Sequence, residues 1–315
     1  MEVLEVSELR KSFKDFVAVD GVSFSVKAGE VFGLLGPNGA GKSTTMMMIA
    51  GLLRPDSGDI LLEGQHFTPE DRLLRHLIGV VPQDLAIYED LTARENLNFF
   101  GSLYGVRGKL LEDRIAETLE RIGLTERADD HAGTFSGGMK RRLNFGAGLL
   151  HKPRLLILDE PTVGVDPQSR SHLLDCVRSL REEGVGIIYA SHYMEEVEAI
   201  CERVAIIDRG QRIAYDHIHH LLGQVGSGLK LRISPPQNGL MERLKGKATL
   251  QKTALDENLL LISRLPENRN EDLREELKDV LREIERSHVE LHGIDTEEPS
   301  LEKLFLDLTG KSLRD

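Results

Sequence analysis

The segment from Gly36 to Thr44 has the residue types needed to bind a phosphate chain. It fits the pattern G-x-x-x-x-G-K-[ST] and consists of Gly36, Pro37, Asn38, Gly39, Ala40, Gly41, Lys42, Ser43 and Thr44. Glycines let backbone N–H groups wrap around a phosphate, and the N-terminus of a following helix adds a favourable dipole. We expect Lys42 to reach the β- and γ-phosphates of a bound nucleotide and the Ser43 hydroxyl to bind Mg²⁺.

Four short apolar runs end in residues that can act on such a ligand. One leads into the glycine-rich segment, and the others end at Gln83, at Asp159 and Glu160, and at His192. Since ligands bind at the carboxyl ends of the strands in an open parallel sheet, these residues are predicted to share one site. Asp159 can hold the metal, and Glu160 can accept a proton from an attacking water. Gln83 can bridge metal and water, while His192 can contact the γ-phosphate or orient the water.

A second helix is predicted to begin after Phe135, with Ser136 as its N-cap and Gly137 and Gly138 shaping the turn. It is a second N-terminus able to bind an anion. Because the first loop already holds one nucleotide's phosphates, the second is useful only towards a nucleotide on another molecule. This arrangement predicts a dimer that closes over ATP. The basic residues at 140–142 on the same helix are expected to form a solvated face.

Two further positions keep two interpretations each. Asp166 precedes a proline at the first position of a helix, so capping that helix and a role at the dimer interface are both expected. Phe13 is the first candidate for stacking on adenine, Phe16 competes with it, and a core role for either is equally compatible with the sequence.

The elements that must position these residues follow an alternating pattern up to about residue 208. Apolar runs of four to six residues alternate with helical spacing, which is typical of a parallel sheet covered on both faces. We predict an α/β fold whose opening, at 4–6, 18–19 and 22–26, forms three short strands of an antiparallel β flap. A mostly helical subdomain is expected at about 84–150.

The composition changes at 223–228, a glycine-rich segment that we interpret as a linker between an ATP-binding domain at 1–222 and a second domain at 229–315. The second domain is expected to be α+β with the order β-α-β-β-α-β, which is ferredoxin-like in outline. The prediction includes a hairpin around Asp256-Glu257, an amphipathic helix at 271–286, and a last helix from Ser300 that closes at Gly310.

Composition excludes several classes of protein. The chain has 315 residues, 40% of them hydrophobic, with 52 acidic and 40 basic side chains and a net charge of −12. The acidic balance disfavours nonspecific nucleic-acid binding, so no nucleic-acid partner is expected. Two cysteines exclude a disulfide scaffold and favour a reducing compartment. No apolar run approaches the ~18 residues of a membrane span, and no signal peptide is expected.

Taken together, the motifs resemble those of an ABC-type ATPase. Gly36–Thr44 resembles its Walker A motif, Gln83 its Q-loop and Phe135–Met139 its signature motif. Leu155–Glu160 resembles its Walker B motif, Val165-Asp166 its D-loop and His192 its H-loop. The resemblance covers about residues 1–220. The sequence Ser-Gly-Gly-Met-Lys-Arg-Arg from Ser136, with the segment ending at Gly310, is similar to ATP-binding subunits of ABC-2-type exporters. Met139 replaces a common glutamine and Phe13 a frequent tyrosine; neither removes an atom needed for proton transfer.

The resemblance implies a P-loop NTPase fold with ATP and Mg²⁺ as ligands. Lys42 and Ser43 would bind phosphate and Mg²⁺, Glu160 would be the general base, and Ser136 and Gly138 would contact ATP on the opposite subunit. The implied partners are a separate transmembrane permease and a second ATP-binding subunit, in a homodimer or heterodimer. The location implied is the cytoplasmic side of the cell membrane, as a peripheral subunit.

The permease is expected to dock on the helical part after Gln83, around 85–104. The alternatives are a soluble ABC ATPase acting on ribosomes or DNA, a regulatory nucleotide-binding module without hydrolysis, and a P-loop kinase. One cassette without long coiled coils disfavours the first. Glu160 disfavours the second, and the helix after Phe135 together with His192 disfavours the third.

Overall fold

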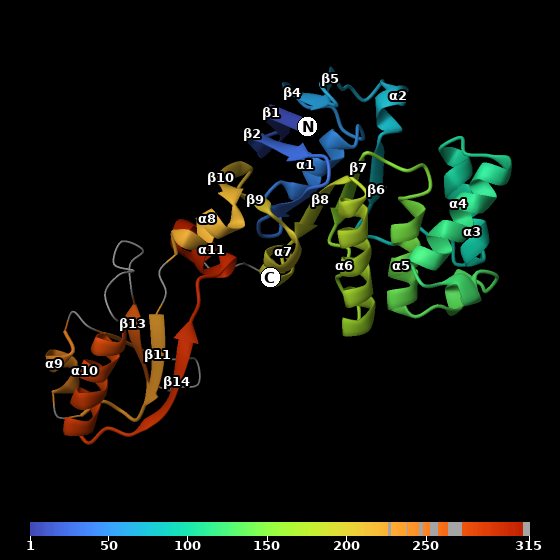
Figure 1. The fold of residues 1–315 in the computed structure, drawn as a ribbon. Coiled ribbons are helices and arrows are strands. Elements are labelled where there is room, and N and C mark those ends of the chain that lie inside the picture. Colours follow the sequence, from blue (N-terminus) through green and yellow to red (C-terminus); the bar gives the residue numbers. More distant parts are fainter. Residues whose placement is uncertain (226–227, 238, 246–247, 253–257, 264–272, 311–315) are drawn as a thin grey trace. The chain divides into compact units, whose positions relative to one another are not determined.

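The computed structural model describes residues 1–225, 228–237, 239–245, 248–252, 258–263 and 273–310. The chain forms two compact units, one comprising Met1–Ile218 and the other beginning at His219 (Figure 1). The division falls at the start of helix α8 (Ile218–Gly223). Among the described helices, none combines the length and the apolar character that crossing a bilayer requires.

A six-stranded sheet forms the centre of the first unit, in the order β10-β9-β3-β8-β7-β6. Strand β3 runs parallel to β8 and β9, β7 runs parallel to β6 and β8, and only β10 is antiparallel to its neighbour β9. The predicted parallel sheet is therefore confirmed. Its strands are β3 (Val31–Leu35), β6 (Ile78–Val81), β7 (Leu155–Asp159), β8 (Gly186–Ser191), β9 (Arg203–Asp208) and β10 (Gln211–His217).

A second, antiparallel sheet with the order β2-β1-β4-β5 contains β1 (Glu2–Phe13), β2 (Phe16–Lys27), β4 (Ser57–Leu62) and β5 (Gln65–His66). The predicted antiparallel flap is confirmed, but the prediction of three short strands was wrong, because 18–19 and 22–26 both belong to β2, which forms one long hairpin with β1. Bulges near Glu8 (φ 51°) and Gly21 (φ 74°) interrupt the apolar alternation without ending the ladder. This sheet and α1 (Lys42–Ile49) share one core with Phe32 and Leu34 of β3.

Helices cover the remaining surfaces of the central sheet. Helices α6 (Pro167–Glu182) and α7 (Met194–Ile200) pack against β8. The backbone of Gly33 in β3 lies so close to α7 that an added Cβ would come within 2.6 Å of Val197. The predicted helical subdomain follows the short α2 (Arg72–Arg75) in the chain. It contains α3 (Ala93–Leu103), α4 (Gly108–Arg121), α5 (Gly137–Ala147) and the 3₁₀ helices η1 (Thr125–Arg127) and η2 (Ala132–Thr134). Helices α3, α4 and α5 lie close together in Figure 1.

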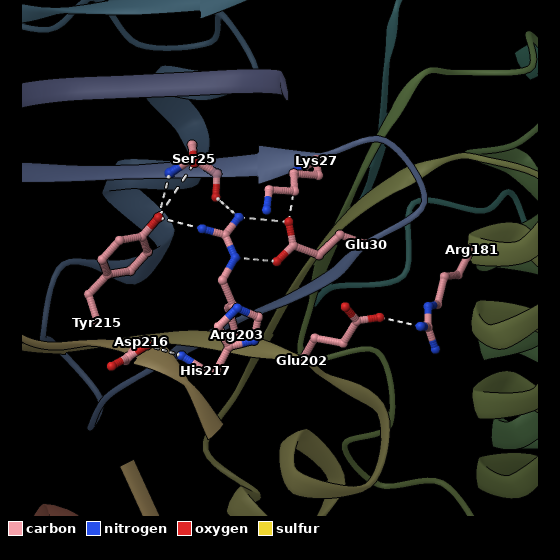
Figure 2. Close-up of polar contacts among 9 residues, drawn as sticks. All are labelled: Ser25, Lys27, Glu30, Arg181, Glu202, Arg203, Tyr215, Asp216 and His217. Carbon is pink, nitrogen blue, oxygen red and sulfur yellow. Dashed lines mark hydrogen bonds and ion pairs between the residues drawn. The ribbon is translucent and has the colours of Figure 1, made fainter. Parts of the chain in front are cut away.

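A buried ion pair ties the amino end of the central sheet to the antiparallel sheet. Arg203, the first residue of β9, donates to both carboxylate oxygens of Glu30 at 2.6 and 2.8 Å (Figure 2). Its other donors reach the Tyr215 hydroxyl at 2.7 Å and the Ser25 carbonyl at 3.0 Å. The guanidinium thus makes four hydrogen bonds within the chain, which compensate for its burial.

The second unit contains an antiparallel sheet in the order β12-β13-β11-β14, the strand order of a ferredoxin-like fold. Its elements are β11 (Gly228–Ile233), α9 (Leu240–Arg243), β12 (Thr249–Lys252), β13 (Asn258–Ser263), α10 (Leu273–Arg286), β14 (Leu291–Glu297) and α11 (Leu301–Thr309). Leu231, Leu260 and Val280 lie in its core. Strands β12 and β13 pair as predicted, although Asp256-Glu257 lie outside the described residues. Ser300 caps α11, which closes at Gly310.

Candidate nucleotide-binding and hydrolysis site

The loop between β3 and α1 requires glycine at two positions. At Gly36 (φ 153°) an added Cβ would lie 2.2 Å from the carbonyl oxygen of Ile207 in β9. At Gly41 (φ 107°), the N-cap of α1, it would lie 2.4 Å from the carbonyl oxygen of Ala18 in β2. Both positions lie against neighbouring backbone in a conformation that L side chains rarely adopt, so the loop can form only with these glycines.

The Lys42 ammonium lies inside this loop. It is 5% exposed and donates to the carbonyl oxygens of Gly36 at 2.7 Å and Pro37 at 3.1 Å. Burial lowers the pKa of Lys42, an effect that the nearby carboxylates of Glu160 and Asp159 oppose. The ammonium is therefore fixed in place, with most of its hydration removed, between the loop and the end of β7.

The Ser43 hydroxyl, one residue later, faces the carboxylate that ends β7. Ser43 Oγ donates to Asp159 Oδ2 at 3.3 Å. Burial and the charge of Glu160 raise the pKa of Asp159, while the bond from Ser43 and the charge of Lys42 lower it. Two oxygen ligands thus lie next to each other beside the loop. Of the remaining loop residues, Asn38 and Gly39 are exposed, Ala40 is buried and Thr44 is half-buried.

Glu160 and His192 form a pair at the carboxyl ends of β7 and β8. Glu160 Oε1 and His192 Nδ1 are 3.0 Å apart, and the Glu160 side chain is 7% exposed. Glu160 has φ 47°, the left-handed region, and its N–H donates to the Ala190 carbonyl at 2.9 Å. A non-glycine residue held there costs about 1–3 kcal/mol and is typical of functional sites. The backbone therefore turns Glu160 towards His192 instead of continuing the strand.

Gln83 follows β6 and is exposed, but its backbone is tied to α5. Its carbonyl accepts a hydrogen bond from Arg141, and Asn144 joins the same segment by accepting from the Ala86 N–H at 3.0 Å and donating to the Pro82 carbonyl at 3.3 Å. Lys140 pairs with Glu89 at 2.5 Å.

The prediction of a solvated basic face at 140–142 was therefore wrong. Lys140, Arg141 and Arg142 are each half-buried, and Arg142 donates to the carbonyls of Ile122 and Gly123. The side chains bond back onto the segment after Gln83 and onto the end of α4. Reasoning from the sequence missed Asn144, whose signal is a polar residue within the apolar stretch that ends α5.

Ser136 caps α5, accepting from the Met139 N–H at 3.3 Å, and is exposed together with Gly137. Asp166 caps α6 by accepting from the Ser169 N–H at 2.9 Å, and the bonds from Ser169 lower the pKa of Asp166. The two helix ends lie so close at Gly138 that a side chain there would not fit, since an added Cβ would lie 2.2 Å from Ser169 Oγ. A cavity of about 290 Å³ opens here, lined by Ser136, Met139, Arg142, Asp166, Gln168, Ser169 and His172.

Phe13 and Phe16 face each other across the turn between β1 and β2, with exposed fractions of 47% and 61%. A core role is therefore wrong for both. The Ser43–Asp159 hydrogen bond and the Glu160–His192 contact bring these residues together with Lys42, because Lys42 precedes Ser43 and Asp159 precedes Glu160 in the chain. The described contacts do not link the side chains of Gln83, Ser136, Asp166 or Phe13 to that group.

Comparison with known proteins places this geometry in a family. Residues 19–163 match the model of the ABC transporter family. The chain is 45% identical to the linearmycin resistance ATP-binding protein LnrL of Bacillus subtilis (strain 168) over 99% of this chain and 100% of that protein. The chain belongs to the ABC transporter family. It is 38% identical to the daunorubicin/doxorubicin resistance ATP-binding protein DrrA of Streptomyces peucetius, over 98% of this chain and 92% of that protein.

Solved structures agree with this membership. The ATP-binding subunit of an ABC transporter superposes with a TM-score of 0.64 and 30% identity, covering 70% of this chain and 91% of its own. A second neighbour, the ADP conformation of an ATP-binding cassette, has a TM-score of 0.63 and 28% identity over 69% of this chain and 91% of its own. This ABC protein binds and hydrolyses ATP in support of transport, as the sequence motifs predict.

Proposed function

We propose that Lys42, Ser43, Asp159, Glu160 and His192 form one half of an ATP hydrolysis site. The observation that carries the proposal is the 3.0 Å contact between Glu160 and His192 beside a buried lysine held in a phosphate-binding loop. The phosphates of ATP would lie in that loop, where their oxygens replace the Gly36 and Pro37 carbonyls as acceptors for the Lys42 ammonium. Loop N–H groups and Lys42 together would neutralise the negative charge of the phosphates.

The residues present fit a magnesium ion. Ser43 Oγ and Asp159 Oδ2 are hard oxygen ligands 3.3 Å apart at the edge of the phosphate loop, and Mg²⁺ commonly takes one or two protein oxygens plus phosphates and waters. The Gln83 side chain is the third candidate. When bound, the ion would supply charge stabilisation at the β- and γ-phosphate oxygens.

In the proposed hydrolysis step, Glu160 accepts a proton from the attacking water as the water oxygen bonds to the γ-phosphorus. At the same time, the bond between the γ-phosphorus and the bridging oxygen of the β-phosphate breaks. His192 Nδ1 contacts only Oε1 of the Glu160 carboxylate, so this contact orients Glu160 and leaves Oε2 for the water. ADP and inorganic phosphate leave, and the proton passes to solvent.

The general-base role is tested with Glu160→Gln, which keeps the shape of the side chain but removes the basic oxygen. Hydrolysis is expected to fall about 10²- to 10⁴-fold while ATP binding persists and a nucleotide-bound dimer accumulates. The measurements are phosphate release and light scattering with ATP. Parent-rate hydrolysis by this variant would refute the assignment.

We further propose that two such subunits sandwich ATP, with Ser136, Gly137 and Gly138 of one facing the phosphates bound by the other. In support, Ser136 and Gly137 are exposed at the N-terminus of an 11-residue helix, and the cavity there adjoins Asp166. Ser136→Glu should block ATP-dependent dimerisation through charge repulsion with phosphate, whereas Ser102→Glu, at an exposed position of α3, should not. Equal dimerisation of the two variants would count against the sandwich.

A membrane permease is the proposed partner, with export as the direction of transport, since the similar proteins named above are resistance proteins. We place its docking surface on the exposed side chains of the 85–104 segment. Tyr88, Phe99 and Leu103 are 49%, 37% and 65% exposed, and Tyr88 and Phe99 pack edge to face at 4.9 Å. This surface would hold the chain at the cytoplasmic face of the membrane.

Docking is tested by co-purification with a co-expressed permease. The pair Tyr88→Ser and Phe99→Ser should reduce recovery at least about tenfold without lowering basal ATPase activity. Leu73→Ser, an 84% exposed leucine on α2, is the matched control. Charge reversal at Glu89 or Asp90 should also lower recovery. Unchanged recovery and ATPase rate in all of these variants would refute the location.

For the second unit, we propose an accessory role in stabilising or regulating the dimer, with domain limits at 1–222, 223–228 and 229–315. Support comes from its separate core around Leu231, Leu260 and Val280. Deleting residues 225–315 should weaken dimerisation more than ATP binding, as measured by sedimentation and nucleotide titration. Unchanged dimerisation would exclude this role.

A further inference from the structure

Glu196 on α7 is a buried carboxylate that none of the steps above uses. Its side chain is 5% exposed, although it lies on a short helix next to exposed Glu195. Two hydroxyl groups donate to its Oε2, those of Thr162 and Tyr189, each at 2.7 Å. A buried carboxylate requires donors that compensate for its lost hydration, and these two hydroxyl groups supply them at one of its oxygens.

The two hydroxyl donors come from the two segments that carry the hydrolytic pair. Thr162 is 1% exposed and lies two residues after Glu160. Tyr189 is fully buried in β8, three residues before His192. One carboxylate oxygen therefore connects the end of β7 to the end of β8, beyond the backbone bond from the Glu160 N–H to the Ala190 carbonyl.

The other carboxylate oxygen reaches a third segment. Glu196 Oε1 forms an ion pair at 3.0 Å with Nε of Arg170, in the first turn of α6, the helix that Asp166 caps. The Arg170 guanidinium lies 5.2 Å from the ring centroid of Tyr193, and that ring packs against the ring of His192 at 4.2 Å. Arg170 thus extends the cluster to the residue that neighbours His192 in the chain.

We propose that Glu196 is a positioning residue for hydrolysis, which holds the Glu160 segment, the His192 segment and the start of α6 in one fixed relation. In this role it acts through Glu160 and His192 and not by contacting ATP itself. Glu196 would maintain the 3.0 Å distance between Glu160 and His192 and the direction in which Glu160 points. Glu160 needs such support because its left-handed backbone conformation is unfavourable unless neighbouring residues hold it. The inference rests on the proposed roles of Glu160 and His192.

The size of the expected effect follows from the geometry of proton transfer. A misplacement of about 1 Å of a catalytic group costs up to ~100-fold in rate even when the altered residue is remote. Glu196→Gln keeps one oxygen for the two hydroxyls but turns its amide towards the Arg170 cation, so the ion pair is lost. We expect kcat for ATP to fall about 10- to 100-fold, with KM changed less than about twofold.

Glu30→Gln is a matched control. Glu30 has the same 5% side-chain exposure and also pairs with an arginine (Figure 2). It directly precedes β3, however, and so lies at the amino end of the sheet. Both variants should lower the unfolding midpoint, whereas only Glu196→Gln should lower kcat when both are assayed well below that midpoint. Equal losses of kcat would reduce Glu196 to a structural role and overturn the proposal.

A second pair of variants covers the case in which Glu196→Gln fails to fold. Thr162→Val removes the hydroxyl donor at nearly constant shape, and Thr162→Ser restores it. Valine should lower kcat at constant KM and serine should recover most of the loss; equal kcat in both would overturn the proposal. Glu160→Gln is assayed alongside. If Glu160→Gln hydrolyses ATP at the parent rate, the general-base role of Glu160 is refuted. If Glu160→Gln is inactive but Glu196→Gln and Thr162→Val hydrolyse ATP at the parent rate, only the positioning role of Glu196 is refuted.

Discussion

The two ends of the central sheet both bury charged groups, but they do so differently. At the amino end, Arg203 bonds to Glu30, Tyr215 and Ser25, and the bonds to Glu30 raise the pKa of Arg203 (Figure 2). At the carboxyl end, burial lowers the pKa of Lys42 and raises that of Asp159, so burial disfavours the charged form of each.

This difference indicates what each end is for. The amino end matches its charges within the chain and contributes to stability. The carboxyl end places a buried lysine beside two carboxylates and holds Glu160 in the left-handed region, and perturbed pKa values with backbone strain are typical of functional sites. Substitutions at the two ends should therefore separate activity from stability.

The largest effect is expected for Lys42→Met. Hydrolysis should fall at least about 100-fold, because the phosphate charge loses a preorganised donor. The free energy of unfolding without nucleotide should stay at or above that of the parent, since the buried ammonium is removed. Phosphate release measures the hydrolysis rate, and urea denaturation measures the free energy of unfolding. A large loss of stability in Lys42→Met would contradict the distinction between the two ends of the sheet.

Glu30→Ala should show the opposite pattern. Removing one partner of a buried pair leaves the Arg203 guanidinium uncompensated, which costs about 3–5 kcal/mol of unfolding free energy. The kcat of the folded fraction should remain within about twofold of the parent, because the hydrolytic pair lies at the opposite edge of the sheet, at the carboxyl ends of β7 and β8. Urea denaturation with active-site titration checks this prediction, and a kcat loss greater than the folded fraction explains would contradict it.

A pH effect is expected at the amino end of β6. His151 donates from Nε2 to the Ile78 carbonyl at 3.0 Å, and its ring stacks on Tyr104. Burial, with smaller contributions from His76 and Arg114, lowers the pKa of His151 to about 4. The unfolded state, with a pKa near ~6.5, takes up the proton first. Stability from this group is present above that value and is lost as the pH falls towards 4, by about 2 kcal/mol between pH 8 and pH 5.

His151→Phe keeps a stacked ring but cannot titrate. The parent should be the more stable protein at pH 8, and the difference should shrink or reverse at pH 5. Urea denaturation of both proteins at several pH values gives the comparison. A difference that does not vary with pH would show that His151 does not control this dependence.

The smallest effect concerns the exposed aromatic pair at the turn between β1 and β2. Phe13→Ala should raise KM for ATP about fivefold, the equivalent of one aromatic stacking contact of ~1 kcal/mol, with unchanged stability. Phe16→Ala is the matched control and should leave KM unchanged. If only Phe16→Ala raised KM for ATP, Phe16 and not Phe13 would be the residue that stacks on adenine.

The sequence predicted elements whose signals are local. The phosphate loop, the apolar strands, the N-caps Ser136 and Asp166 and the last helix all depend on neighbouring residues, and each is where the pattern places it. The opening hairpin was misjudged because bulges interrupt alternation without ending the backbone ladder. The basic residues after Met139 were misjudged because their acceptors lie about 20 to 60 positions away in the chain.

The amino-acid sequence by itself determined the phosphate loop, the order of the strands along the chain and which polar residues end them, since these follow from short-range spacing. Only the tertiary structure decided that Glu160 turns back onto His192 and that Thr162, Tyr189 and Arg170 converge on Glu196. Such contacts depend on which strands become neighbours and on how burial compels polar groups to find partners, and neither appears in the local pattern.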